Sequence, residues 1–361
     1  MNPIQIHNKF TCLLATGILI MFLGLASCSD NPVSSLQEKE LVSLLVANEG
    51  AFGGDSGSLS SYDPATGQTV RTKFQQANGR ELAGIIQNVL LSGDRLFIVA
   101  NNIDKIEVVD AHSLESLAII NFDESGLTPA GFALANENKG YVSNLFDNSV
   151  AVVDLENYTV TDTRIEVGSN PRDLVVAGNR LFVANSGFGN DNTVTVINTE
   201  TDEVLTTVTV GPGPERLRMD SNQNIWVVSV GNRPWGEPEN NVPGRIDVLD
   251  GSTAEHLATV ETGGFPKAIT VSQEAGQAWV VNTEAVQRID MNSYELLEET
   301  FIRRSFNGIG YSEVENRLYL AHSLGYEQSG QAIIYDLEGA AIDSFQVGIA
   351  PMDFIFQVEL N

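Results

Sequence analysis

The sequence has almost no cysteine and little positive charge. Its 361 residues include two cysteines, Cys12 and Cys28, both within the first 28 positions. A chain without cysteine beyond that point forms no disulfide, so another device must hold its fold together. Lysine and arginine number 20 against 47 aspartates and glutamates, which gives a net charge of −27. Such a surface repels phosphate backbones and anionic headgroups, which argues against binding to nucleic acid or directly to a membrane surface.

Residues 1–27 are predicted to form a bacterial lipoprotein signal peptide. Lys9 supplies the charged start, residues 13–25 form an apolar stretch, and a small-residue cleavage site ends in Cys28. The apolar stretch is shorter than the roughly 20 residues that a membrane span needs. In such signals the cysteine becomes the lipidated N-terminus, so Cys28 is the predicted lipidation site. Residues 28–40 are then the lipidated cysteine and a flexible tether.

This N-terminus predicts a lipid-anchored protein of the bacterial outer membrane. The anchor is the only expected contact with the membrane, and loss of Lys9 moves the net charge from −27 to about −28. The Ser29-Asp30 pair resembles the acidic signals that send some lipoproteins to the cell surface. Exposure on the cell surface is therefore favoured, and the periplasmic face stays open.

No long amphipathic helix pattern occurs in the remainder, which consists of repeats. Seven apolar runs end at the same small polar position: Asn48, Asn101, Asn144, Asn185, Ser229, Asn282 and His322. A second series of runs closes on Asp63, Asp110, Asp154, Asn198, Asp250, Asp290 and Asp336, at spacings of 40 to 52 residues. That period is typical of one propeller blade, about 40–50 residues.

The strand pattern within each repeat predicts an all-β fold. Short β-branched segments separated by Asn, Asp and Gly turns indicate four hairpin-linked strands per repeat. We expect residues 41–361 to form one seven-bladed β-propeller of four-stranded antiparallel blades. The segment from Pro351 to Val358 matches a first strand with no blade after it. It is predicted to complete blade one, which removes the exposed edge of an open array.

Four unusually long loops distinguish one face of the predicted propeller. They join second to third strands and span residues 49–56, 186–192, 230–244 and 323–329, each with an aromatic among glycines and amides. Repeat folds carry insertions on the binding face, and such mixed surfaces suit large polar ligands. The recurrent Asn lies at the rim of this face. Turn chemistry alone also selects Asn, so a structural role is the alternative for each copy.

No catalytic residue and no metal site are predicted. The segment from Gly54 to Gly57 resembles a serine-protease loop, but the only histidine upstream is His7 in the signal peptide. His322 is the one histidine expected at the rim, and a lone histidine without cysteines is a poor zinc site. A propeller lactonase or lyase with a metal held by oxygen ligands stays open, because such a site leaves little sequence signature.

Two segments resemble known families. The Tyr141-Val142-Ser143-Asn144 quartet and its relatives resemble YVTN-type β-propeller repeats of bacterial surface and periplasmic proteins. Residues 48–53 followed by residues 57–63 resemble blade one of the DUF5074 family of lipoprotein propellers, although Ala51 stands where Asn is expected. That family includes surface cobalamin-binding proteins that sit over TonB-dependent cobalamin transporters. The resemblance therefore implies a surface lipoprotein that captures a corrinoid and passes it to such a transporter.

The predicted ligand-binding residues combine rim amides with loop aromatics. They are Phe52, Asn101, Asn144, Asn185, Phe188, Arg233, Trp235, Asn282, His322 and Tyr326. The amide-fringed flat ring of a corrinoid suits such a surface, and no cofactor is expected beyond this ligand. Two alternatives stay open: a surface scaffold for a protein or glycan partner, and a metal-dependent hydrolase or lyase.

Overall fold

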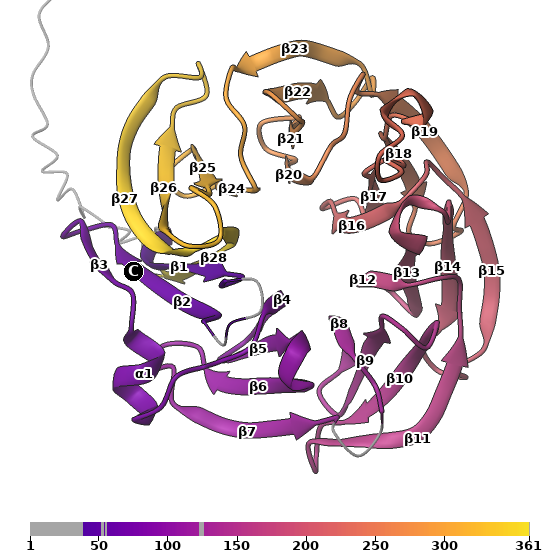
Figure 1. Cartoon of the computed structure of the whole chain (residues 1–361), viewed down its shortest axis with the longest axis horizontal. Coiled ribbons are helices and arrows are strands. Elements are labelled where there is room, and N and C mark those ends of the chain that lie inside the picture. Colours follow the sequence, from indigo (N-terminus) through magenta and orange to yellow (C-terminus); the bar gives the residue numbers. More distant parts are fainter. Residues whose placement is uncertain (1–38, 52–53, 55, 123–125, 361) are drawn as a thin grey trace, which may run out of the picture. The chain divides into compact units, whose positions relative to one another are not determined.

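The computed structural model describes residues 39–51, 54, 56–122 and 126–360. These residues form seven four-stranded antiparallel sheets arranged around a common axis, as Figure 1 shows. The predicted all-β, seven-bladed propeller is confirmed. The predictions for residues 1–38, which include the signal peptide and Cys28, lie outside the described residues. Within the described part, no helix has the length and apolar character to cross a membrane.

The blades follow one another along the chain, and the strands of each blade are ordered from the axis outward. Blade one is β28 (Pro351–Leu360), β1 (Lys39–Asn48), β2 (Ser58–Asp63) and β3 (Gln68–Val70). Blade two is β4 (Ile86–Ser92), β5 (Arg95–Ala100), β6 (Lys105–Asp110) and β7 (Ser116–Asn121). Blade three is β8 (Pro129–Asn136), β9 (Lys139–Asn144), β10 (Ser149–Asp154) and β11 (Thr159–Glu166). Blade four is β12 (Pro171–Ala177), β13 (Arg180–Asn185), β14 (Thr193–Asn198) and β15 (Val204–Thr209).

The remaining blades repeat this order. Blade five is β16 (Pro214–Met219), β17 (Asn224–Ser229), β18 (Arg245–Asp250) and β19 (His256–Glu261). Blade six is β20 (Ala268–Ser272), β21 (Gln277–Val281), β22 (Val286–Asp290) and β23 (Leu296–Ile302). Blade seven is β24 (Gly308–Ser312), β25 (Arg317–His322), β26 (Ser329–Tyr335) and β27 (Ala341–Ile349). Helix α1 (Lys73–Asn78) and 3₁₀ turns at Asn101–Ile103, Gly187–Gly189 and Pro238–Asn240 lie in connections.

The terminal strands close the ring as predicted. Strand β28 pairs antiparallel with β1 along its length, from Lys39 opposite Leu360 to Asn48 opposite Pro351. Strand β1 begins at Lys39, slightly before the predicted boundary at Leu41. Because blade one takes strands from both ends of the chain, its hydrogen bonds replace the disulfides that the sequence lacks.

The repeated aspartates fix the turns between third and outermost strands. In every blade the closing Asp or Asn side chain accepts a hydrogen bond from the backbone N–H two residues later, at 2.7 to 3.1 Å. This side-chain turn explains why the second repeat series ends in Asp or Asn. Such hydrogen bonds hold the pKa of Asp110 below its usual range, with the Ser113 N–H contributing most.

The core lies between neighbouring sheets. The second strands are almost wholly buried, and their large side chains Trp226, Trp279, Tyr141 and Tyr319 have no exposed surface. Side chains of neighbouring blades pack together in hydrophobic clusters. One cluster joins Phe97 of blade two to Phe132 of blade three, with ring centroids 4.8 Å apart. The Trp226 indole N–H also donates to the Asp220 carboxylate at 3.1 Å. Packing of each blade on the next positions the innermost strands around the axis.

Candidate functional site

A cavity of about 350 Å³ lies on the axis, at the loop-rich face of the propeller. Long loops contribute Glu49, Arg233 and Tyr326 to its wall, and the innermost strands contribute the residues deeper inside. The inner wall consists of Gln87, Arg172, Glu215, Arg216, Lys267 and Met352. Loop residues and the innermost strands of several blades therefore converge on one volume.

Bulges at the start of the innermost strands turn these side chains toward the axis. The pairing register shifts between Pro171 and Leu174 in blade four, and between Pro214 and Arg216 in blade five. A similar shift follows Ile86 in blade two. A bulge inserts an extra residue and redirects the neighbouring side chains. Proline suits this position because a strand entry needs no ladder donor there.

The cavity is rich in cations although the protein is acidic. Arg172, Arg216, Arg233 and Lys267 line it, against two carboxylates, Glu49 and Glu215. Within the described part of the chain, none of these four cations has a carboxylate within 4.0 Å, the limit for an ion pair.

Hydrogen bonds to Gln87 hold Arg172 and Arg216 in place. The Arg172 guanidinium donates to the Gln87 side-chain oxygen at 3.2 Å, and Arg216 donates to the Gln87 backbone carbonyl at 3.3 Å. The Arg172 Nε is buried and has no hydrogen-bond partner among the described residues. This one donor of Arg172 is therefore left without an acceptor among the described residues.

Burial is the largest cause of the pKa shifts of two ionisable groups in the cavity, Glu49 and Lys267. Burial raises the pKa of Glu49, against the opposing charges of Arg216 and Arg172 and a hydrogen bond with Gln87. Burial likewise lowers the pKa of Lys267, and the neighbouring Arg233 charge adds to that effect. Both groups are partly shielded from water, and this favours their uncharged forms.

A paired arginine forms the layer below the cavity. Arg218 contacts the Asp173 carboxylate at 3.4 Å and the Asp353 carboxylate at 3.1 Å. Burial works to lower its pKa, but the charges of Asp353 and Asp173 outweigh burial and raise it. Asp173 also accepts from the Leu217 N–H at 2.9 Å. These contacts link β12, β16 and β28 across the axis.

Aromatic rings surround the mouth of the cavity. The Arg233 guanidinium lies 4.7 Å from the centre of the Phe265 ring, and Arg172 lies 5.5 Å from that of Phe188. Phe188 has a backbone φ of 51°, which is rare for a bulky side chain. The charge of Glu49, followed by burial, raises the pKa of Tyr326, and both residues line the cavity.

The long loops of blades four and five support each other beside the mouth. The Asn232 side chain donates to the Asn190 side chain at 3.2 Å, joining residues 230–244 to residues 186–192. Asn232 also pairs with Val242 through two backbone hydrogen bonds, which closes the longer loop on itself. Gly189, at φ of 95°, lies against the Asn232 backbone, where a side chain has little room. These contacts give the loops a defined conformation.

Three of the residues predicted to contact a ligand are buried and hydrogen-bonded within the protein. Asn144, Asn185 and Asn282 are at most 6% exposed. Asn185 donates to the Thr195 hydroxyl at 2.9 Å, and Asn282 donates to the Gln287 side-chain oxygen at 3.1 Å. Asn144 accepts from the Thr128 N–H at 2.8 Å. Such hydrogen bonds stabilise the blade. Asn282 also lines a cavity of about 520 Å³, and the ligand contact predicted for the three residues stays a prediction.

The other predicted site residues fall in different places. Arg233 and Tyr326 line the cavity, and Phe188 lies at its edge through Arg172. Trp235 is fully exposed on the loop of blade five. Asn101 donates to the Pro129 carbonyl at 3.0 Å, and the His322 ring lies 6.1 Å from that of Phe306. Phe52 lies outside the described residues. The ligand contact predicted for these residues stays a prediction.

The deepest cations of the cavity were not among the predicted residues. Arg172 and Lys267 each follow the proline that opens a blade, and Arg216 stands two positions after Pro214. The signal was the residue type one or two positions after these prolines, where the strand begins beside the axis. The recurrent Asn drew attention instead because it repeats, whereas the axial residues differ from blade to blade.

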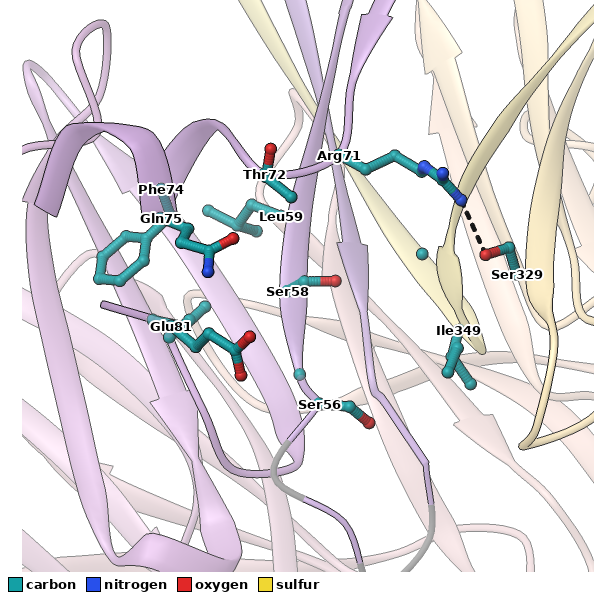
Figure 2. A pocket seen from close by; sticks show the side chains of 13 residues that line it. Ser56, Ser58, Leu59, Arg71, Thr72, Phe74, Gln75, Glu81, Ser329 and Ile349 are labelled. Carbon is teal, nitrogen blue, oxygen red and sulfur yellow. Dashed lines mark hydrogen bonds between the residues drawn. The ribbon is translucent and has the colours of Figure 1, made fainter. Parts of the chain in front are cut away.

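A second cavity, of about 270 Å³, lies between blades one and seven. Leu59, Phe74 and Ile349 form apolar parts of its wall. Figure 2 shows Arg71 reaching across to Ser329, which accepts a hydrogen bond at 2.9 Å. This cavity is away from the axis and draws on fewer blades, so the axial cavity is the stronger candidate. Within the described residues, no group of three metal-ligating side chains occurs.

Comparisons with known proteins identify a family and a common fold. A family described as a domain of unknown function (DUF5074) matches residues 43–314. No curated protein matches the chain in sequence.

Several solved structures share the fold. A quinonprotein alcohol dehydrogenase-like protein from Bacteroides thetaiotaomicron is 13% identical, with 88% of this chain and 78% of that chain covered and a TM-score of 0.67. Apo AztD from Citrobacter koseri is 12% identical, with 88% and 98% covered and a TM-score of 0.55. Dihydro-heme d1 dehydrogenase NirN, solved in complex with DHE, is 11% identical, with 88% and 75% covered and a TM-score of 0.58. At these identities the likeness shows the propeller fold alone, and it includes both enzymes and other proteins.

Proposed function

The chain belongs to the DUF5074 family, and we propose that it is a binding protein whose ligand occupies the axial cavity and the loop-rich face around it. The observation that carries this proposal is the convergence of Glu49, Arg233 and Tyr326 from long loops on a cavity walled by the innermost strands. Concave sites with a few fixed polar groups among aromatic rings are typical of small-molecule binding. No catalytic residue is assigned.

A corrinoid is the ligand class that suits this surface best. Its flat ring matches the aromatic rings of Phe188, Phe265 and Tyr326 around the mouth, and its amide side chains match donors such as Gln87. A corrinoid is larger than the cavity of about 350 Å³. One part of the ligand would therefore enter the cavity while the ring stays on the loops.

The predicted lipid anchor gives this role a place in the cell. With Cys28 lipidated, the propeller would be tethered to the outer membrane, most usefully on the cell surface. A TonB-dependent transporter is the proposed partner that receives the ligand. A pull-down from solubilised outer membranes tests this partnership, with a Cys28→Ser protein as the control for anchoring.

Calorimetric titration with cyanocobalamin tests the ligand. The protein used begins at Ser29 and so retains every described residue. One-to-one binding is expected, and Trp235→Ala and Tyr326→Ala should each weaken it about tenfold or more, as truncated aromatic anchors do. Leu257→Ala is the matched control, because Leu257 is 44% exposed on the outer strand β19. The corrinoid proposal fails without binding, and unchanged affinity in both aromatic variants overturns the placement.

A surface scaffold is the second candidate, and exposed apolar side chains on the loop-rich face favour it. Trp235 is 100% exposed and Phe146 is 66% exposed. Exposed aromatics on a binding face suit a protein or glycan partner. Acrylamide quenching of Trp235 fluorescence discriminates the candidates, because Trp226 and Trp279 have no exposed surface. Protection by cyanocobalamin supports capture of a small molecule, whereas protection only by outer-membrane extract supports the scaffold.

A further inference from the structure

The axial cavity reverses the sign of charge that the rest of the protein carries. Four of the 20 basic residues line it, in a chain with 47 acidic ones. We propose that this cavity is an oxyanion site, in which Arg172, Arg216 and Lys267 bind a phosphate-ester or carboxylate group of the ligand. The inference deepens the proposed function and rests on it, because both assign the ligand to the same face.

The absence of ion pairs is the first argument. Several other partly buried cations have a carboxylate partner; for example, Lys105 lies 3.0 Å from Glu107, and Arg245 lies 3.0 Å from Asp247. Within the described residues, Arg172, Arg216 and Lys267 nevertheless have none within 4.0 Å. Arginine and lysine in a recess of this kind are the groups that bind phosphate and carboxylate oxygens.

The two carboxylates in the wall do not neutralise these cations. Glu215 accepts a hydrogen bond from the Ser186 hydroxyl at 3.4 Å. Glu49 hydrogen-bonds with Gln87, and its burial favours the uncharged form. Even with both ionised, four cations against two anions leave an excess of two positive charges. A neutral ligand group would leave that excess unmatched inside a shielded cavity.

Arg172 is already oriented for an anion. Its guanidinium donates to Gln87 at 3.2 Å and lies 5.5 Å from the centre of the Phe188 ring, while its Nε is buried without a partner. Phe188 keeps its ring there despite a φ of 51°, an uncommon conformation that clusters at ligand sites in proteins. A side chain held in this way loses little entropy when it binds a ligand oxyanion.

Melting of the protein from Ser29 to Asn361 with two simple probes tests the site. Inorganic pyrophosphate represents phosphate esters and citrate represents carboxylates, each compared with sodium chloride at equal ionic strength. A rise of about 2 °C is expected from the probe that fits. Arg172→Gln and Arg216→Gln should abolish the rise, with Lys267→Gln as a further variant should an arginine variant melt early. Arg71→Gln, which removes the same charge from the second cavity, should keep it.

The outcomes of this test decide the inference. A rise with pyrophosphate alone assigns a phosphate-ester group, and a rise with citrate alone assigns a carboxylate. No rise with either probe overturns the oxyanion site, as does an equal rise in every variant including Arg216→Gln.

A pair of corrinoids separates this inference from the proposed function. Dicyanocobinamide lacks the phosphodiester that cyanocobalamin carries. With a phosphate site, the native protein should bind cyanocobalamin at least about tenfold more tightly than dicyanocobinamide, and Arg216→Gln should remove the difference. Equal binding of both corrinoids by the native protein keeps the corrinoid function and refutes the phosphate site. A response to pyrophosphate or citrate without corrinoid binding keeps the oxyanion site and refutes the corrinoid.

Discussion

Arg218 and Arg172 lie on neighbouring innermost strands, β16 and β12, yet they have opposite surroundings. Arg218 lies between two carboxylates, at 3.4 Å and 3.1 Å. Arg172 has no carboxylate within 4.0 Å among the described residues and leaves its Nε without a partner. The same side chain therefore does two jobs at different depths of one axis. The lower arginine joins blades, and in our proposal the upper one binds a ligand.

Arg218, Asp173 and Asp353 form the lower layer of the axis. Asp353 links this layer to ring closure. Asp353 belongs to β28, the strand that pairs with β1, and its carboxylate accepts from Arg218 on β16 at 3.1 Å. Blade five is thus bonded across the axis to blade one. Arg172, Arg216 and Lys267 form the upper layer. Removing the lower layer should reduce stability, whereas removing the upper layer should reduce ligand binding.

The largest effect is expected when both the closing strand and Asp353 are removed. Deletion of residues 351–361 leaves β1 with an unpaired edge and Arg218 without one carboxylate. We expect loss of the cooperative thermal transition, measured by near-ultraviolet circular dichroism. A protein ending at Val358 keeps most of β28 and is the control. A native-like transition in the longer deletion would show that closure does not hold the ring.

Breaking the lower layer alone should be the next largest effect. Arg218→Gln leaves the buried Asp173 without its cation, so we expect a loss of about 3–5 kcal/mol in the free energy of unfolding. Urea unfolding measures it. Arg216→Gln, two residues earlier on the same strand, is the matched control. Equal stability of the two variants would erase the distinction between the layers.

The buried amides should contribute less. Asn185→Ala removes a hydrogen bond to Thr195 and is expected to lower the free energy of unfolding by about 1–3 kcal/mol. Its ligand affinity should stay unchanged under conditions where the protein is folded. Urea unfolding and titration on the same sample check both statements, with Asn101→Ala as the less buried comparison. A large loss of affinity in stable Asn185→Ala protein would return this residue to the binding site.

The smallest change in stability is expected in the upper layer. Arg216→Gln removes a cation that lies beside other cations and has no carboxylate within 4.0 Å among the described residues, so the free energy of unfolding should change by no more than about 0.5 kcal/mol, or rise. The same variant should lose ligand binding. Strong destabilisation by Arg216→Gln would mean that this arginine has a structural role instead.

The repeat pattern predicts the blades well because each blade solves the same packing problem. The closing residues Asp63 to Asp336 recur since every third strand ends in the same turn, and Pro351 to Val358 was recognisable as a strand without a blade. The short helix α1 was not predicted, because its six residues depend on Phe74 packing into the core and carry no periodic pattern.

The site was harder to predict because its residues do not repeat from blade to blade. Asn recurs at the rim because a buried amide suits each blade, so its repetition reflects a structural requirement of the blades. Arg172, Arg216 and Lys267 do not recur, and register shifts at the start of β12 and β16 accompany the two arginines. A bulge depends on the pairing of the folded strands, which sequence periodicity does not reveal.

Calorimetric titration of pyrophosphate into native protein and Arg216→Gln, each beginning at Ser29, tests the division between the two layers most directly. The account predicts saturable binding to the native protein and none to Arg216→Gln, although the variant melts at or above the native temperature. Equal binding by both proteins, or loss of binding together with early melting, would contradict it.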